Sequence, residues 1–119
     1  MRRSPEEIET IKRAKARLDQ LDFYPEPVRI GHVRILHVPW LFRLPWFRRF
    51  VGYECGPAIF VKRPLDELSN DLVTHELCHI WQLQHHPVRM PLSFFKTPYK
   101  RNGYEREARW AVDQTRGNP

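Results

Sequence analysis

The pentapeptide His75–His79 (His-Glu-Leu-Cys-His) most constrains the fold of this chain, because it lies within a stretch of helical character. An α-helix brings residues four apart onto one face, so both histidine side chains can reach one metal ion. Thr74, Ile80 and Trp81 flank the motif and are uncharged, as a helix buried in a small domain requires. The pattern predicts a buried metal-binding helix; the alternative is an amphipathic helix with two surface histidines.

The residue types in this motif are typical of a hydrolytic zinc site. Zinc takes histidine nitrogen ligands and lowers the pKa of a bound water. Glu76 lies one position round from the histidine face, where its carboxylate can accept a proton from that water. We therefore expect His75 and His79 to bind one Zn²⁺ ion, with Glu76 as the general base. Tyr99 and Tyr104 are candidates for stabilising an oxyanion or contacting the substrate.

A catalytic zinc normally needs a third protein ligand. His85 has the metzincin spacing, ten residues after His75, but Gln82 occupies the position of the glycine that ends the metzincin helix. If the helix continues, His85 lies about 15 Å along the axis from His75. A glutamate from the C-terminal segment is the other candidate. The apolar stripe of that segment does not choose between Glu105 and Glu107.

The remaining pattern predicts an α+β fold with an N-terminal helix, a small twisted sheet, the zinc helix and a C-terminal glutamate helix. Ser4 can cap the first helix, which is expected to run to about Gln20. The alternating segments 28–30 and 33–38 are expected to form one bent strand or a strand pair, and 51–55 and 58–61 are two short strand candidates. The zinc helix is expected from between 66 and 70 to about 84, followed by an ordered loop at 85–102 that contains Pro87, Pro91 and Pro98. A last helix is expected from 104 to about 116, with a buried stripe that begins at Tyr104.

Length and composition bound the function classes. A chain of 119 residues is expected to form a single domain, 1–119, and 41% hydrophobic content is typical of a globular protein. No apolar run approaches the length of a membrane span, and no secretion signal is recognised, so we expect a cytoplasmic monomer. The net charge of +6 allows nucleic acid or an anionic membrane surface as a partner, although solubility alone also explains it.

Residues 51–61, 65–68 and 75–79 together resemble the small gluzincin peptidases. These include the minigluzincins and the catalytic cores of the CAAX-processing and heat-shock membrane peptidases. The resemblance implies a zincin-like fold in which an edge strand, a second strand and the zinc helix follow in order. It also implies that the third ligand is the first glutamate of Glu-x-x-Ala-Asp, which corresponds to Glu105 here. Arg109 replaces the aspartate of that motif, which would brace a ligand histidine.

These observations favour a zinc-dependent metallopeptidase that hydrolyses a peptide or protein substrate, with Glu76 as the base. Two alternatives remain. The first is a zinc-binding regulatory or interaction module that keeps the zincin fold with little or no turnover. The second is a basic domain that binds nucleic acid or anionic membranes, in which the pentapeptide is incidental.

Overall fold

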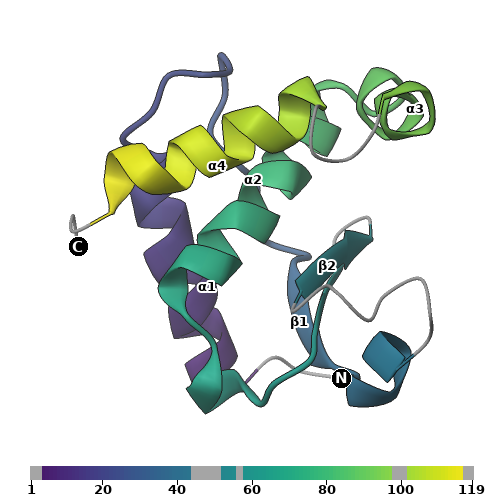
Figure 1. Cartoon of the computed structure of the whole chain (residues 1–119). Helices are drawn as coiled ribbons and strands as arrows, with labels where there is room; N and C mark the ends of the chain where they lie inside the picture. The colour runs from purple at the N-terminus through teal and green to yellow at the C-terminus, as the bar shows by residue number, and fades with distance from the viewer. Residues whose placement is uncertain (1–3, 44–51, 56–57, 98–101, 117–119) are drawn as a thin grey trace.

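The first helix, α1 (Pro5–Leu18), begins at the predicted cap. The side chain of Ser4 accepts a hydrogen bond from Glu7 N at 3.1 Å, and Pro5 stands in the first turn, where no intrahelical N–H is needed. The structure, a computed structural model, describes residues 4–43, 52–55, 58–97 and 102–116. Within these ranges the chain has four α-helices and one sheet, which confirms the α+β class (Figure 1).

The elements after α1 alternate short strands with helices. They are β1 (Arg34–His37), the 3-10 helix η1 (Pro39–Arg43), β2 (Gly52–Cys55), β3 (Ala58–Val61), the 3-10 helix η2 (Leu65–Glu67), α2 (Asn70–His85), α3 (Arg89–Lys96) and α4 (Gly103–Thr115). None of the helices in the described ranges has the length and apolar character needed to span a membrane.

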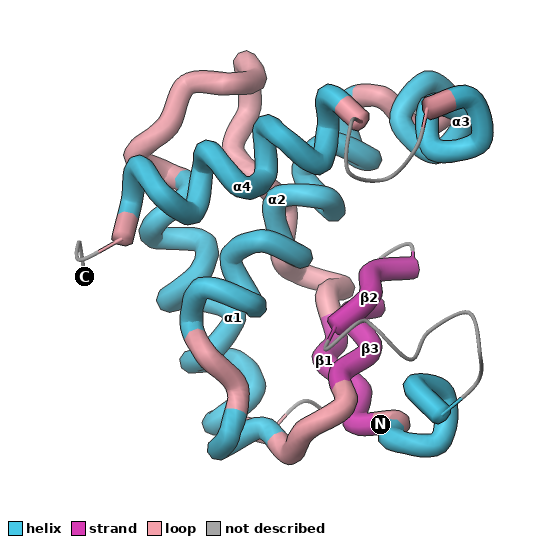
Figure 2. The backbone as a smooth tube through the Cα atoms, viewed as in Figure 1, coloured by secondary structure: helices cyan, strands magenta, loops and turns pink. Residues whose placement is uncertain are grey.

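The sheet has the order β1-β3-β2. β1 pairs with β3 in parallel, with Ile35 opposite Ile59, and β2 pairs with the other side of β3 in the antiparallel sense. Ile35, Ile59 and Val61 are buried and join the hydrophobic core. The predicted strand at 51–55 is therefore confirmed over Gly52–Cys55, and β2 forms an edge of the sheet. Figure 2 shows the sheet to one side of the helices.

The strand predicted at 28–30 is wrong, because side chains rather than a neighbouring strand bind this backbone. The amide of Gln84 pairs with Arg29, accepting from its N at 2.9 Å and donating to its O at 2.8 Å. Trp81 Nε1 donates to Glu26 O at 2.8 Å in the same loop. Residues on the second half of α2 therefore hold the loop between α1 and β1 against the helix.

The metal-binding helix predicted by the motif is α2, and it lies at the centre of the fold (Figure 1). It contacts α1, α3, α4, β2 and β3. Ser69 caps its first turn by accepting from Leu72 N at 3.0 Å. Val73, Leu77 and Ile80 are buried in the core on this helix, which confirms that the motif lies on a buried helix.

The ordered loop predicted at 85–102 is also wrong in part, since it contains α3 (Arg89–Lys96). Pro91 lies in the first turn of this helix, where the missing N–H costs nothing. Met90 anchors the helix and is only 3% exposed. Pro87 precedes this helix and Pro91 lies within its first turn, so prolines at these positions are compatible with a short helix.

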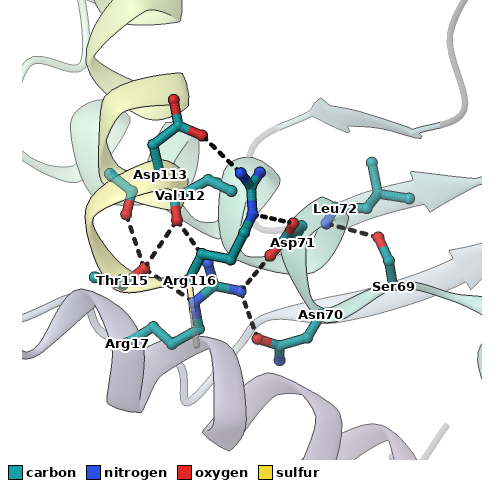
Figure 3. A network of polar contacts seen from close by, with 10 residues as sticks. Arg17, Ser69, Asn70, Asp71, Leu72, Val112, Asp113, Thr115 and Arg116 are labelled. Carbon is teal, nitrogen blue, oxygen red and sulfur yellow. Dashed lines mark hydrogen bonds and ion pairs between the residues drawn. The ribbon is translucent and has the colours of Figure 1, made fainter. Parts of the chain in front are cut away.

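Two buried charged residues tie α1 to the rest of the fold. Glu7 Oε2 accepts from Ile35 N at 2.9 Å and from Arg34 Nε at 3.0 Å, which links α1 to β1. Arg17 reaches the opposite end of the molecule, where α2 begins and α4 ends (Figure 3). An N-terminal helix packed against the sheet is the expected arrangement; instead α1 packs mainly along α2, and Glu7 links it to β1.

Candidate metal centre

His75, His79 and Glu105 form one group in which the potential ligand atoms all lie within 4.8 Å of one another. His75 Nε2 lies 2.6 Å from Glu105 Oε1, and His79 Nε2 lies 3.0 Å from Glu105 Oε2. Among the described residues, this is the group of His, Cys, Asp and Glu side chains with such an arrangement. The structure thus brings the carboxylate implied by the resemblance to the two histidines of the motif.

The two histidines lie one turn apart on α2, with ring centroids separated by 4.9 Å. Glu105 comes from α4, whose start is fixed by Asn102. The Asn102 side chain accepts from Tyr104 N at 2.8 Å and donates to Ser93 Oγ of α3 at 3.0 Å. The buried stripe of α4, predicted to begin at Tyr104, begins instead at Glu105, because this carboxylate faces α2. The stripe continues through Ala108, Ala111, Val112 and Thr115.

The electrostatics of the group are those of a buried carboxylate between two imidazoles. Burial opposes ionisation of Glu105, but hydrogen bonds with His75 and His79 hold its pKa well below the usual range. Burial by itself would lower the pKa of His79, yet the hydrogen bond with Glu105 and the charge of Glu76 raise that pKa to about 9. A bound metal ion would replace the protons shared in these contacts.

The donor set fits a zinc ion. Two neutral imidazole nitrogens and one carboxylate match the ligands of catalytic zinc sites. The side chain of Glu105 is only 2% exposed and that of His79 6%. An ion held here would be shielded from solvent by the protein around Glu105 and His79. The side chain of His75 is 17% exposed, which makes it the most exposed of the three.

Glu76 lies next to this group but forms no hydrogen bond or ion pair with its three members. It is buried, and burial raises the pKa of its carboxyl, while the nearby His79 and His75 act in the opposite direction. Among the described residues, its side chain makes no hydrogen bond or ion pair. A structural salt bridge, which would have argued against catalysis, is therefore not formed with any of them.

Gln82 supports His79 from behind, a role that the motif did not reveal. Its Oε1 lies 2.7 Å from His79 Nδ1, on the opposite side of the ring from Glu105. Gln82 is fully buried, one turn after His79 on the same helix. The sequence contains a signal for this contact in the three-residue spacing from His79 to Gln82, which places the two on one helix face.

The alternative third ligands lie elsewhere. Glu107 Oε1 accepts from Tyr24 Oη at 2.6 Å and from Gln82 Nε2 at 3.0 Å, so it is hydrogen-bonded behind the group. His85 stacks on Tyr24 with ring centroids 4.9 Å apart, and its Nε2 is 3.2 Å from Glu26 O. Neither residue joins the group of three. The helix continues through Gln82, as the absence of glycine there implied.

The two tyrosines proposed to face the substrate have different outcomes. Tyr104 is half-buried at the start of α4, with its ring centroid 6.0 Å from that of His86. Its carbonyl oxygen accepts a hydrogen bond from Gln82 Nε2 at 2.8 Å. Tyr99 lies outside the described residues. A role for either tyrosine in the reaction stays a prediction.

Arg109 occupies the position where the gluzincin motif has aspartate. It lies one turn after Glu105 on α4, and its Nε is 3.7 Å from Glu105 Oε1. Its side chain is about half exposed, at 47%. The residue therefore brings a cation to the solvent side of the carboxylate instead of bracing a histidine.

Comparison with known proteins yields no relatives: no protein-family model, curated protein or solved structure matches this chain. Function is therefore inferred from the geometry and chemistry of the site.

Proposed function

We propose that this chain is a zinc-dependent metallopeptidase with a zincin-like fold of the gluzincin type. His75, His79 and Glu105 hold one zinc ion, and Glu76 is the general base. One observation carries the proposal: Glu105 arrives from a separate helix, 26 residues after His79, and places its two carboxylate oxygens on the two histidines of the motif. A chance pentapeptide on a structural helix gives no reason for a buried carboxylate at this position.

The residues of the site have two separate tasks, which are binding the zinc ion and transferring a proton. Zinc, when bound, supplies the positive charge that acidifies a water molecule and polarises the scissile carbonyl. Glu76 accepts the proton of the attacking water and then delivers it to the leaving nitrogen. Burial raises the pKa of Glu76, which brings the carboxylate closer to the range where it both accepts and releases a proton near neutral pH.

The position of β2 supports a peptide as substrate. This strand is at the edge of the sheet and contacts α2, which carries His75 and His79. An edge strand offers unpaired backbone groups to an extended peptide, which would then lie along the strand beside the metal-binding helix. The chain is therefore suited to bind its substrate by main-chain pairing.

The decisive experiment compares Glu76→Gln with the wild type. Glutamine keeps the shape of the side chain and removes the base, so cleavage of a diverse peptide library should fall by at least about 100-fold. Zinc content, measured by mass spectrometry of the metal, should stay at one ion per chain. His79→Ala is the matched variant, which should lose zinc and cleavage together. Wild-type protein that binds no zinc, or cleavage that survives in Glu76→Gln, would contradict the proposal.

One observation favours the second candidate function, a zinc-binding module without turnover. Three side chains of the site are each almost completely buried, namely Glu76, His79 and Glu105. This burial restricts the space for a substrate at the ion. In this case the wild type should bind zinc with full stoichiometry and cleave no member of the library. The same pair of measurements thus separates the two functions.

A further inference from the structure

We propose that Gln82 and Glu107 are positioning residues that orient His79 for metal binding, in place of the aspartate that this chain lacks. This inference rests on the proposed zinc site. It concerns a hydrogen-bonded series of four side chains, His79, Gln82, Glu107 and Tyr24, which runs from the metal centre to the loop after α1. We call this series the Gln82 relay.

The orientation of the Gln82 amide is fixed by its partners. Its Nε2 donates to Tyr104 O at 2.8 Å and to Glu107 Oε1 at 3.0 Å. Tyr104 O is a backbone carbonyl oxygen, which can only accept a hydrogen bond. The amide nitrogen must therefore point toward α4. This leaves Gln82 Oε1, an acceptor, at 2.7 Å from His79 Nδ1.

An acceptor at Nδ1 determines which nitrogen of His79 carries the proton. Nδ1–H donates to Gln82 Oε1, so in the neutral ring Nε2 has the lone pair. Nε2 is the atom that lies 3.0 Å from Glu105 Oε2, on the side where the metal would bind. The relay therefore prepares the tautomer that a metal ion needs and holds the ring in place.

Glu107 and Tyr24 set the polarity of the relay from its far end. Tyr24 Oη donates to Glu107 Oε1 at 2.6 Å. Burial, and to a smaller extent this hydrogen bond, raises the pKa of Tyr24, so the phenol keeps its proton and remains a donor. With Tyr24 donating to it, Glu107 accepts from Gln82. Glu107, first considered as a metal ligand, is thus a carboxylate that acts on the metal centre through a neutral amide.

The first test is zinc affinity measured by competition with a chelator. Gln82→Met keeps the size of the side chain and removes both hydrogen-bonding atoms, and we expect zinc affinity to fall about 10–100-fold. Glu107→Gln replaces the carboxylate with a neutral amide, whose oxygen is a weaker acceptor for Gln82 Nε2, and we expect a smaller loss. Gln84→Met is the matched control: it removes an amide from the same helix, where Gln84 binds the backbone of Arg29, and should leave affinity within about twofold.

The second test is an NMR signal that a purely structural role would not alter. In the wild type, the hydrogen bond should protect the Nδ1 proton of His79 from exchange and make it visible in ¹⁵N-coupled spectra. The signal should disappear in Gln82→Met and persist in Gln84→Met. Thermal unfolding of each metal-free variant is followed in parallel, so that a loss of folding is recognised.

The outcomes separate this inference from the proposed function. Wild-type protein without zinc binding would contradict the proposed function, whereas the protected proton in the metal-free protein tests the relay independently. The relay is overturned if Gln82→Met and Gln84→Met bind zinc equally well, or if the metal-free wild type shows no protected proton on Nδ1 of His79. If Gln82→Met does not fold, the wild-type spectrum and Glu107→Gln still decide.

Discussion

Nη1 of Arg17 lies 2.8 Å from Oδ1 of Asp71, so a buried guanidinium of α1 forms an ion pair with the first turn of α2. The same guanidinium donates through Nη2 to Val112 O and through Nε to Thr115 Oγ1 (Figure 3). Three helices therefore meet at one side chain, at the end of α2 remote from Gln82.

Replacing Arg17 with methionine should lower the free energy of unfolding by about 2–4 kcal/mol, because the buried acceptors on α4 lose their donor. Urea unfolding followed by circular dichroism measures the change. Arg13→Met is the control on the same helix: Arg13 is exposed and lies 3.7 Å from the exposed Glu9, so its replacement should cost less than about 0.5 kcal/mol. Equal effects of the two substitutions would contradict the structural role of Arg17.

The contact with Arg17 also predicts a pH dependence of stability. The hydrogen bond from Arg17 lowers the pKa of Asp71 below 3.8, against a smaller opposing effect of burial. A lowered folded-state pKa gives stability that is fully present above the unfolded value and is lost as pH falls through the folded value. Asp71→Asn should therefore flatten the loss of stability below about pH 4. Acid titration of the unfolding midpoint tests this, with Asp66→Asn as the control.

Arg109 should weaken metal binding, because its guanidinium lies 3.7 Å from a ligand oxygen of Glu105. Arg109→Ala removes this cation and should raise zinc affinity by roughly two- to fivefold, a modest effect because the side chain is half exposed. The difference should shrink at high salt, where the charge is screened. Arg106→Ala, on the exposed face of α4, serves as control. A lower affinity in Arg109→Ala would instead indicate that the arginine holds Glu105 in place.

The two glutamates of α4 should respond differently to the same substitution. Glu105→Ala removes the third ligand, so zinc should be lost on gel filtration. Glu107→Ala should retain one ion per chain with reduced affinity, since Glu107 acts through Gln82. Metal content after gel filtration distinguishes the two, and the reverse result would make Glu107 the ligand.

Cys78 should be inert in the folded protein although it lies within the motif. Its thiol is fully buried. This burial is the main cause that raises the pKa of the thiol, and the charge of Glu107 is the second. Thiolate is the reactive form, so a thiol reagent should modify Cys78 only after unfolding. The measurement uses a Cys55→Ser protein, in which Cys78 is the remaining cysteine. Rapid labelling under native conditions, at a rate independent of unfolding, would argue against this burial.

The elements that were predicted well are those whose signals are local. Ser4 and Pro5 mark the start of α1 through capping and backbone geometry, which depend on a few adjacent residues. The buried helix that carries the motif, α2, follows from the spacing of His75 and His79 and from its uncharged flanks. Glu105 could be chosen over Glu107 only from the resemblance, because both residues flank the apolar stripe. In the structure, α4 packs on α2 so that Glu105 contacts His75, whereas Glu107 accepts from Gln82.

The features that were missed depend on contacts between distant parts of the chain. Gln84 binds both backbone groups of Arg29, 55 residues away, so an alternating pattern at 28–30 became a loop held by a helix. Pro91 indicated a loop but occupies a first turn, where helices accept it. The role of Gln82 depends on which oxygens surround its amide, and these come from α4.

Glu105 follows His79 by 26 residues, and this separation has a consequence for the order of events during synthesis. A chain emerging from the ribosome presents the two histidines of α2 well before the carboxylate of α4. If the site binds zinc as proposed, an ion at that stage would meet only two of its three ligands and would be held weakly, and tight capture would wait until α4 has docked on α2. Loading with metal would then report that the protein has finished folding, and an unfinished or misfolded chain would remain empty.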